Sequence, residues 1–166
     1  MKKIILVATV LLIIVPVITK FAGTRTTNWL PVLMTRTQLE TSIKALPAKP
    51  LLKPGKIYAK EHLFFIVEAY KGIHIINNSD PENPKIEGFI TVPGCVDLAI
   101  KGNVMYVDNA VDLVAIDLSA LPEITIKKRI KNIFPELVHP EWGYVPSEFS
   151  AQNRPENTII TGWVQE

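Results

Sequence analysis

The segment Lys60-Glu61-His62-Leu63-Phe64-Phe65-Ile66 decides the fold, because it has a counterpart 41 residues further on in Lys101-Gly102-Asn103-Val104-Met105-Tyr106-Val107. Further matches follow it: His74-Ile75-Ile76-Asn77 with Val114-Ala115-Ile116-Asp117, Ser79 with Ser119, and Pro84 with Pro122. The offset drifts from 41 to 40 to 38 residues, as expected when turns differ in length and strands do not. The sequence therefore predicts one small structural unit used twice.

Each copy is rich in β-branched and aromatic residues and is bounded by Gly, Asn, Asp and Pro, a composition typical of strands and turns. The first copy (55–94) divides into the predicted strands Lys56–Lys60, His62–Glu68, Gly72–Asn77 and Ile86–Val92. The second copy (95–132) divides into Val96–Lys101, Asn103–Asn109, Asp112–Asp117 and Ile124–Ile130. Four short antiparallel strands in about forty residues is the size of a propeller blade.

The inner strands favour blades stacked face to face. Leu63 to Val67 is apolar at every position, so both faces of that strand should be covered. A β-sandwich also buries inner strands, but it usually shows clearer alternation. We therefore predict an all-β fold: a partial β-propeller of about two four-stranded blades, preceded by an N-terminal signal or anchor helix and one short helix.

The N-terminus has the layout of a secretory signal. Met1-Lys2-Lys3 supplies positive charge, and Ile4 to Ile18 is an apolar run interrupted at two positions. The run is shorter than the roughly 20 residues that span a bilayer, although Thr19 to Gly23 would bring a tilted anchor within reach. We predict a signal peptide or membrane anchor over 1–23, and an exported protein that is periplasmic, in the cell envelope or membrane-anchored. A buried core helix is the alternative that fits the lysine pair less well.

Residues 24–54 are predicted to be a spacer that contains one short helix, over residues 35–46. Thr35 or Thr37 provides its N-cap, and Pro47 ends it. Its apolar residues fall on one face, which should pack on the domain.

Residues 133–166 are rich in proline and aromatic residues and end in a predicted strand, Thr158–Val164. We expect the segment to cover an open side of the blades through its aromatic residues: Phe134, Trp142, Tyr144 and Phe149. Trp142-Gly143-Tyr144 and Trp163 could instead form an aromatic platform for a ligand, but aromatic residues in such a cover more often close the edge of a core.

The charge and the cysteine content argue against nucleic-acid binding and exclude an intrachain disulfide. Three of the 18 basic residues lie in the N-terminal segment (Lys2, Lys3 and Lys20), and the remaining 15 face 16 acidic residues. Near neutrality argues against nucleic acid as a partner, because phosphate binding needs a clustered cationic surface. Cys95 is the only cysteine, so no intrachain disulfide can form. We expect it to be an inert, small apolar side chain.

No residue is predicted to be catalytic, to bind a cofactor or to bind a metal. The second copy holds four acids at strand ends and turns, Asp97, Asp108, Asp112 and Asp117, but they lack the spacing of a calcium loop, and turn chemistry accounts for them. The three histidines, His62, His74 and His139, have no ligand partner nearby in sequence. Residues 77–84 are best interpreted as a hairpin loop, although they contain the glycosylation triplet Asn77-Asn78-Ser79.

Two segments carry a resemblance to a known family: Gly72-Ile73-His74-Ile75-Ile76-Asn77 and Leu113-Val114-Ala115-Ile116-Asp117. They resemble the signature of the LVIVD repeat proteins, and the likeness extends from about Pro31 to Phe134. The resemblance implies a β-propeller-like fold and an exported location, with no agreed activity and no catalytic motif. Members of that family tend to be longer, with further repeats, and some carry a lipid-attachment cysteine that this chain lacks.

These observations predict an exported, non-catalytic module that binds a protein or glycan at the cell envelope and reaches the membrane through its N-terminal segment if that segment is uncleaved. Because two blades leave two faces uncovered, self-association or further downstream repeats should be needed. One alternative is an exported enzyme or metal protein with a site between blades, drawn from Glu68, His74, Asp108 and Asp112. Another is a truncated remnant with no independent function.

Overall fold

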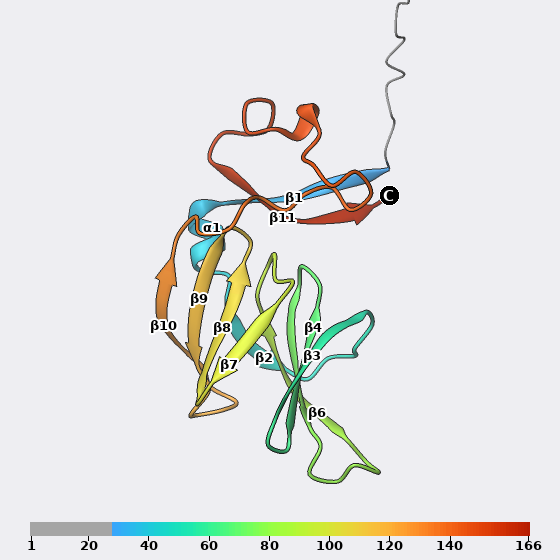
Figure 1. Cartoon of the computed structure of the whole chain (residues 1–166), viewed down its shortest axis with the longest axis vertical. Helices are drawn as coiled ribbons and strands as arrows, with labels where there is room; N and C mark the ends of the chain where they lie inside the picture. The colour runs from blue at the N-terminus through green and yellow to red at the C-terminus, as the bar shows by residue number, and fades with distance from the viewer. Residues whose placement is uncertain (1–27) are drawn as a thin grey trace, which may run out of the picture.

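The computed structural model describes residues 28–166, and this part of the chain is all-β (Figure 1). It contains three antiparallel sheets, none of them closed, together with one short α-helix and one 3-10 turn. The predicted all-β class and the single short helix are therefore confirmed for these residues. The predicted signal or anchor helix over 1–23 lies outside them.

The first large sheet is built on four strands in chain order, which we call the first meander. Its strands are β3 (Pro54–Lys60), β4 (Leu63–Glu68), β5 (Gly72–Asn77) and β6 (Lys85–Thr91). Each pairs antiparallel with the next, and β2 (Lys44–Pro47) adds a fifth strand at the outer edge of β6. The sequence predicted the bounds of β5, and the ends of the other three lie within two residues of the prediction.

The second large sheet, which we call the second meander, repeats this connectivity. Its strands are β7 (Leu98–Lys101), β8 (Val104–Asn109), β9 (Asp112–Asp117) and β10 (Thr125–Ile130). They pair antiparallel in chain order. Within residues 28–166 the outer edge of β10 pairs with no further strand, so this sheet has four strands where the first has five.

The two meanders share their strand register. Phe65 of β4 pairs with Ile75 of β5, and Tyr106 pairs with Ala115 at the corresponding place in β8 and β9. The strand pairing therefore identifies which residue of the second meander corresponds to each residue of the first.

A bulge and a turn also recur. Register shifts place one extra residue in the last strand of each meander, Glu87 in β6 and Lys127 in β10. The first hairpin turn of each meander holds a residue in the left-handed region, Glu61 (φ 55°) and Gly102 (φ 58°). The two sheets thus agree in the irregular parts of their backbone as well as in the regular ones.

Residues 36–47 differ from the prediction. The helix α1 spans only Arg36–Glu40, with Thr35 as N-cap in a full capping box with Gln38. The chain then forms β2 instead of continuing as a helix to residue 46. Pairing of four residues of β2 with β6 outweighs the helical spacing of the apolar residues, a tertiary contact that local propensity cannot anticipate.

The third sheet joins the two ends of the described chain. It pairs β1 (Trp29–Thr35), in a segment predicted to be a spacer, with β11 (Thr158–Gln165), a strand that the sequence predicted. Figure 1 shows this pair lying across one end of the meanders. Ile159 packs there with Leu39, Ala110 and Val111 in a small second core.

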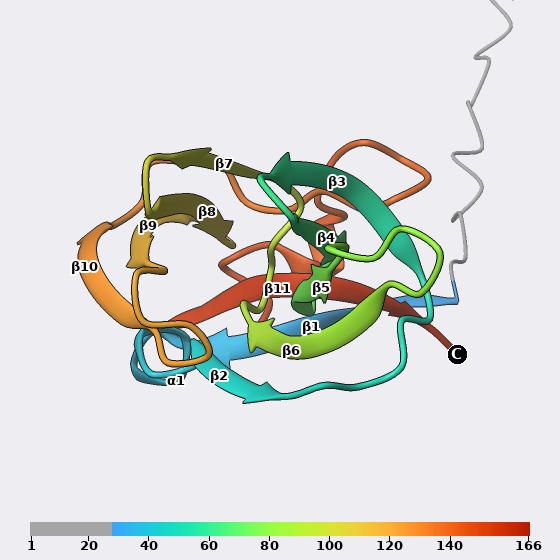
Figure 2. The ribbon, with the colours of Figure 1, turned by 90° about the horizontal axis from the view of Figure 1, so that it is seen from below.

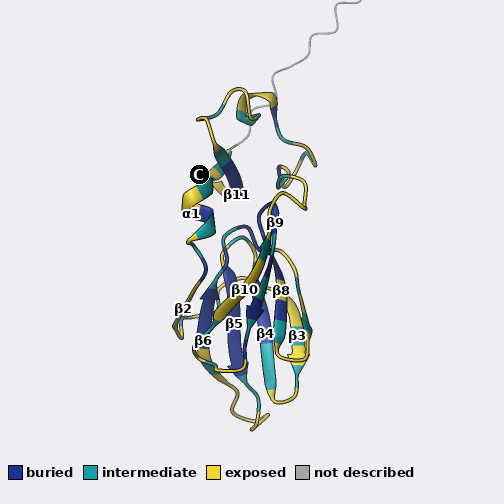
Figure 3. Ribbon diagram, turned by 90° about the vertical axis from the view of Figure 1, so that its left-hand side faces the viewer, coloured by how far each residue is buried: buried dark blue, intermediate teal, exposed yellow. Residues whose placement is uncertain are grey.

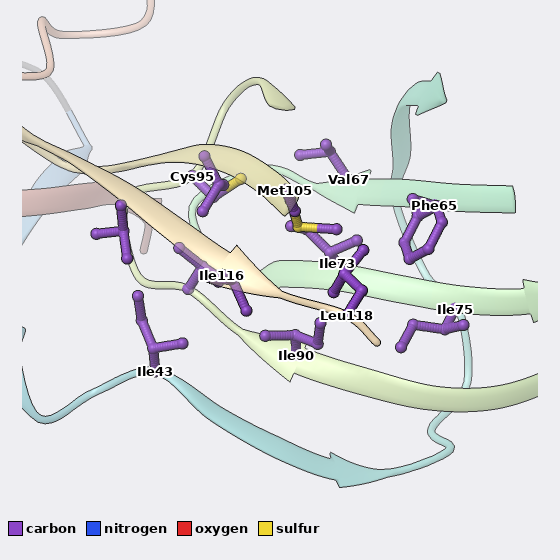
Figure 4. Close-up of a cluster of buried hydrophobic side chains, with 13 residues drawn as sticks. Ile43, Phe65, Val67, Ile73, Ile75, Ile90, Cys95, Met105, Ile116 and Leu118 are labelled. Atoms are coloured by element: carbon purple, nitrogen blue, oxygen red, sulfur yellow. The ribbon is translucent and has the colours of Figure 1, made fainter. Parts of the chain in front are cut away.

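The main core lies between the two meanders (Figure 4). Its largest members come from the central strands of both sheets: Phe65, Val67, Ile73, Ile75, Ile90, Met105, Val107, Val114 and Ile116. Full burial of each such side chain stabilises the fold by roughly 1.5–3 kcal/mol. Figure 3 shows the result as buried central strands β4 and β5 beside the exposed strands β3 and β10.

Candidate functional site

The acids and histidine that could have formed a site between blades lie in three separate places. Glu68 and His74 lie together in the first meander, whereas Asp108 and Asp112 each belong to a different hydrogen-bonded group of the second. Among residues 28–166, no three His, Cys, Asp or Glu side chains lie close enough to hold a metal ion. The structure thus brings together only one pair of the four residues.

The Glu68–His74 pair is buried in the first meander. Glu68 Oε2 lies 2.9 Å from His74 Nε2 and 3.3 Å from Lys49 Nζ, while Oε1 accepts a hydrogen bond from Lys71 Nζ at 2.8 Å. The His74 ring packs edge-on against Phe89, and Lys49 Nζ lies 3.5 Å from the Phe89 ring centroid. The Glu68 carboxylate therefore holds Lys49, and with it the connector between β2 and β3, against the sheet.

These partners keep Glu68 charged. Burial opposes ionisation, but the hydrogen bonds from Lys71 and His74 and the charge of Lys49 outweigh it and lower the pKa of Glu68 to about 2. A carboxylate held so firmly in its ionised form is a poor proton acceptor at neutral pH. The arrangement is suited to anchoring a connector and not to general base catalysis.

Asp112 organises the corresponding end of the second meander. Its carboxylate accepts hydrogen bonds from Arg36 Nη1, at 2.8 and 2.7 Å, and from Arg129 Nη1, at 2.8 Å. The backbone N–H of Asn132 donates to the same group at 3.0 Å, and Arg129 also donates to Asn109. Burial raises the pKa of Asp112, but these donors outweigh that effect and lower it. The network fixes α1 onto the end of β9 and β10.

Asp108 and Cys95 are structural as well. Asp108 accepts hydrogen bonds from the backbone N–H groups of Val96 and Asp97 at 2.9 and 2.8 Å, which ties the segment before β7 to β8. Burial raises the pKa of the Asp108 carboxyl, and burial together with Asp108 raises the pKa of the Cys95 thiol. The fully buried, protonated thiol matches the inert role predicted for it.

The loop between β5 and β6 has the turn chemistry that the sequence predicted. Asn77 Oδ1 accepts a hydrogen bond from the Ser79 backbone N–H at 2.8 Å, and Asn77 Nδ2 donates to Glu87 at 2.8 Å. At the corresponding place in the second meander, Asp117 accepts from Ser119 at 2.9 Å and pairs with Lys127. The amide of the Asn77 glycosylation triplet is therefore already engaged in fixing a bulge.

The C-terminal aromatic residues pack around β11 instead of over the outward sheet faces. His139 is buried and stacks on Trp142 with centroids 4.3 Å apart, and Trp142 stacks on Tyr144 at 5.9 Å. Trp163 contacts both His139 and Phe149, at 5.1 and 5.7 Å. Figure 1 shows this segment beyond the β1–β11 pair, on the side away from the meanders.

Two hollows open on the groove between the meanders. The first, about 230 Å³, is lined by Lys56, Ile57, Tyr58, Asp97 and Leu98. The second, about 420 Å³, is lined by His62, Leu63, Ile75, Glu87, Gly88, Leu121 and Pro122. Lys56 pairs with Asp97 across the first, and Glu87 in the second accepts the Asn77 amide. Neither lining contains a Ser, Cys or Thr side chain.

The strongest candidate site is the outward face of the second meander, one of the two end faces that the sequence predicted would be uncovered. The first meander buries Phe65 and Ile73 against its neighbour, but the residues that correspond to them in the second, Tyr106 and Leu113, lie on the opposite side from the core. Tyr106 is 39% exposed, whereas Phe65 is 0% exposed. The alignment of Phe65 with Tyr106 was the signal that could have revealed this.

The opposite outward face, that of the first meander, is covered at its centre and exposed at its margins, where Leu46 and Ile57 are 43% and 63% exposed. Ile66, His74 and Phe89 on it are buried. Figure 2 shows the connector from β2 to β3 running along this side of the sheet, and Lys49 of the connector contacts Phe89. The centre of this face is therefore covered, whereas Tyr106 on the outward face of the second meander is exposed.

Comparison with known proteins identifies no relative: no protein-family model, curated protein or solved structure matches the chain. Among residues 28–166, no helix has the length and apolar character needed to cross a membrane. The case for a function therefore depends on the geometry of the sheets and their surfaces.

Proposed function

We propose that the protein is an exported, non-catalytic repeat protein of the LVIVD type, which acts as a binding or scaffold module at the cell envelope. In this proposal the two meanders are two blades of a β-propeller-like stack. Support comes from the shared register, the bulges at Glu87 and Lys127, and the matching turns at Asn77 and Asp117. Export rests on the lysines and apolar run at the N-terminus.

The observation that carries the proposal is the head-to-tail packing of the two sheets. Met105 and Val107 of the second meander enter the core, but the residues that correspond to them in the first, Phe64 and Ile66, face away from it. The two sheets therefore contact each other through faces that do not correspond. A contact of this kind leaves one copy of each face unused, so it can be repeated by a further sheet.

A further sheet of the same type is the partner that this geometry favours. It would pack its counterpart of Met105 and Val107 against Tyr106, Leu113 and Ala115. Such a sheet could be supplied by additional repeats or by a second protein, and the face offers apolar and aromatic area typical of an interaction surface. A protein partner at the cell envelope is thus favoured over a small-molecule substrate.

Self-association of the exported chain tests the proposal. We expect sedimentation velocity to show concentration-dependent association or, if a partner copurifies, a larger complex. Tyr106→Lys should abolish this, whereas Ile57→Lys, a matched change at a residue 63% exposed on the other meander, should leave it intact. A monomer at all concentrations, unaffected by Tyr106→Lys and without a copurifying partner, would refute the role of this face. Export is tested separately with a C-terminal alkaline phosphatase fusion, whose inactivity would refute it.

A further inference from the structure

The outer edges of the two meanders correspond in position but differ in what covers them. The outer edge of β6 is paired with β2 over four residues, from Lys44 opposite Thr91 to Pro47 opposite Gly88. The outer edge of β10 pairs with no strand within residues 28–166, and five of its six residues are exposed. Figures 1 and 2 show β10 at the margin of the molecule with no element beside that edge.

We propose that β10 accepts an extended acidic segment of another protein as a fifth strand, in the way that β6 accepts β2. An unpaired edge presents a row of backbone N–H and C=O groups that an extended peptide can complete. The shared bulge at Glu87 and Lys127 keeps the two edges in the same register. The first meander thus supplies the geometric precedent for the added strand.

The chemistry of the added strand follows from the residues that it would face. β2 lies opposite Gly88, Phe89, Ile90 and Thr91, none of them charged. The residues at the same positions beside β10 are Lys128, Arg129, Ile130 and Lys131, three of them basic. Opposite charges directly across two strands are stabilising and like charges are destabilising. The edge therefore favours glutamate or aspartate in its partner.

The three cations are not equally available. Arg129 is already bound by Asp112, and Lys131 pairs with Glu40 at 2.6 Å. Lys128 forms no ion pair with any residue of 28–166. It is exposed and pairs with Ala115 of β9. Lys128 is therefore the residue on which charge selection should depend most.

The N-terminal segment of this chain is an unsuitable occupant. Residues 1–27 contain no Asp or Glu and carry Lys2, Lys3, Lys20 and Arg25. Like charges would oppose its addition to β10. Residues 1–27 are therefore not the proposed occupant, which is an acidic segment of another protein.

Two synthetic peptides test the proposal with the full exported chain: a ten-residue peptide alternating Glu and Val, and the same peptide with Lys in place of Glu. We expect the Glu peptide to slow amide hydrogen exchange in residues 125–131 and to bind up to about tenfold more tightly than the Lys peptide, since a favourable charge pair with Lys128 is replaced by an unfavourable one. N-methylation of alternate residues in the Glu peptide should abolish binding, because it removes the backbone donors.

Lys128→Glu should weaken binding of the Glu peptide and strengthen binding of the Lys peptide. Lys85→Glu, a change of equal charge at an exposed residue of β6, should alter neither preference. Absence of protection in 125–131, protection confined to another segment, or equal affinity for the two peptides would each overturn the proposal. The alternative role of lysine at a free edge, prevention of strand addition, predicts that neither peptide binds.

Discussion

The first and second meanders have the same strand order, the same ladder register and a bulge at the same place, yet their outer surfaces differ. In the first, Lys49 of the connector covers Phe89 at the centre of the outward face, and β2 pairs with the outer edge. In the second, Tyr106 and Ile130 remain 39% and 42% exposed and the edge is lined by cations. The comparison teaches that strand pairing and surface chemistry vary independently. Strand pairing determines the position of each side chain, and the element packed against that position determines which residue type is suitable there.

The largest expected effect distinguishes the covered face from the open one. Phe65→Ala should reduce the free energy of unfolding by about 3–5 kcal/mol, because it leaves a cavity in the main core. Tyr106→Ala, at the corresponding position of the second meander, should cost less than about 1 kcal/mol in the monomer. Urea denaturation followed by circular dichroism measures both, and equal losses would mean that the outward face is covered.

A second test removes the charge at the end of the second meander. Asp112→Asn leaves Arg129, whose side chain is 11% exposed, without its carboxylate and should cost about 2–4 kcal/mol. The corresponding residue of the first meander is Gly72, so that sheet has no equivalent network. Asp97→Asn, which breaks an exposed ion pair with Lys56, is the matched control. If the two variants lose the same stability, the Asp112 network does not hold α1 in place.

A third test uses pH and concerns the connector that Glu68 binds through Lys49. Glu68→Gln should cost about 1–3 kcal/mol at neutral pH, because Lys49, Lys71 and His74 lose a charged acceptor. The folded pKa of Glu68, about 2, lies below its ordinary value of 4.5. Its stabilisation is therefore complete above pH 4.5 and is lost as the pH falls toward 2.

The stability difference between the wild type and Glu68→Gln should accordingly shrink between pH 4.5 and 2. Glu82→Gln, in the exposed loop between β5 and β6, controls for the loss of one negative charge. A difference that stays constant across this range would show that the carboxylate is not held by its cationic partners.

The smallest expected effect comes from the two equivalent hairpin turns. Gly102→Ala should cost about 1 kcal/mol, because φ at this position is 58° and no neighbouring atom would be displaced. Glu61→Gly should change stability in the opposite direction, since a side chain there already occupies the left-handed region. Thermal denaturation of both variants compares the turns, and changes of the same sign would show that they are not equivalent.

Much of the fold follows from local sequence. The strands of both meanders were predictable because segments rich in β-branched residues are separated by turn residues at short intervals, and because the Lys60 and Lys101 segments resemble each other. The capping box at Thr35 was equally clear. Each of these features depends on a few residues that are close together in the sequence.

The misses all depend on contacts between distant residues. β2 was mistaken for helix because Leu39, Ile43 and Leu46 have helical spacing, and only pairing with β6 reveals a strand. Nothing near Trp29 indicates that its strand pairs with the far end of the chain. Glu68 and His74 meet because their strands are adjacent, a contact that a cross-strand alignment of β4 and β5 could have revealed.

The pairing of β1 with β11 has a consequence for biosynthesis. The first described strand to leave the ribosome has to wait for residues 158–165 before its hydrogen bonds can form. Both meanders can fold during that interval, since each closes through hairpins between successive strands. We therefore expect the terminal pair to form last, with β1 unpaired by β11 until synthesis of β11 is complete.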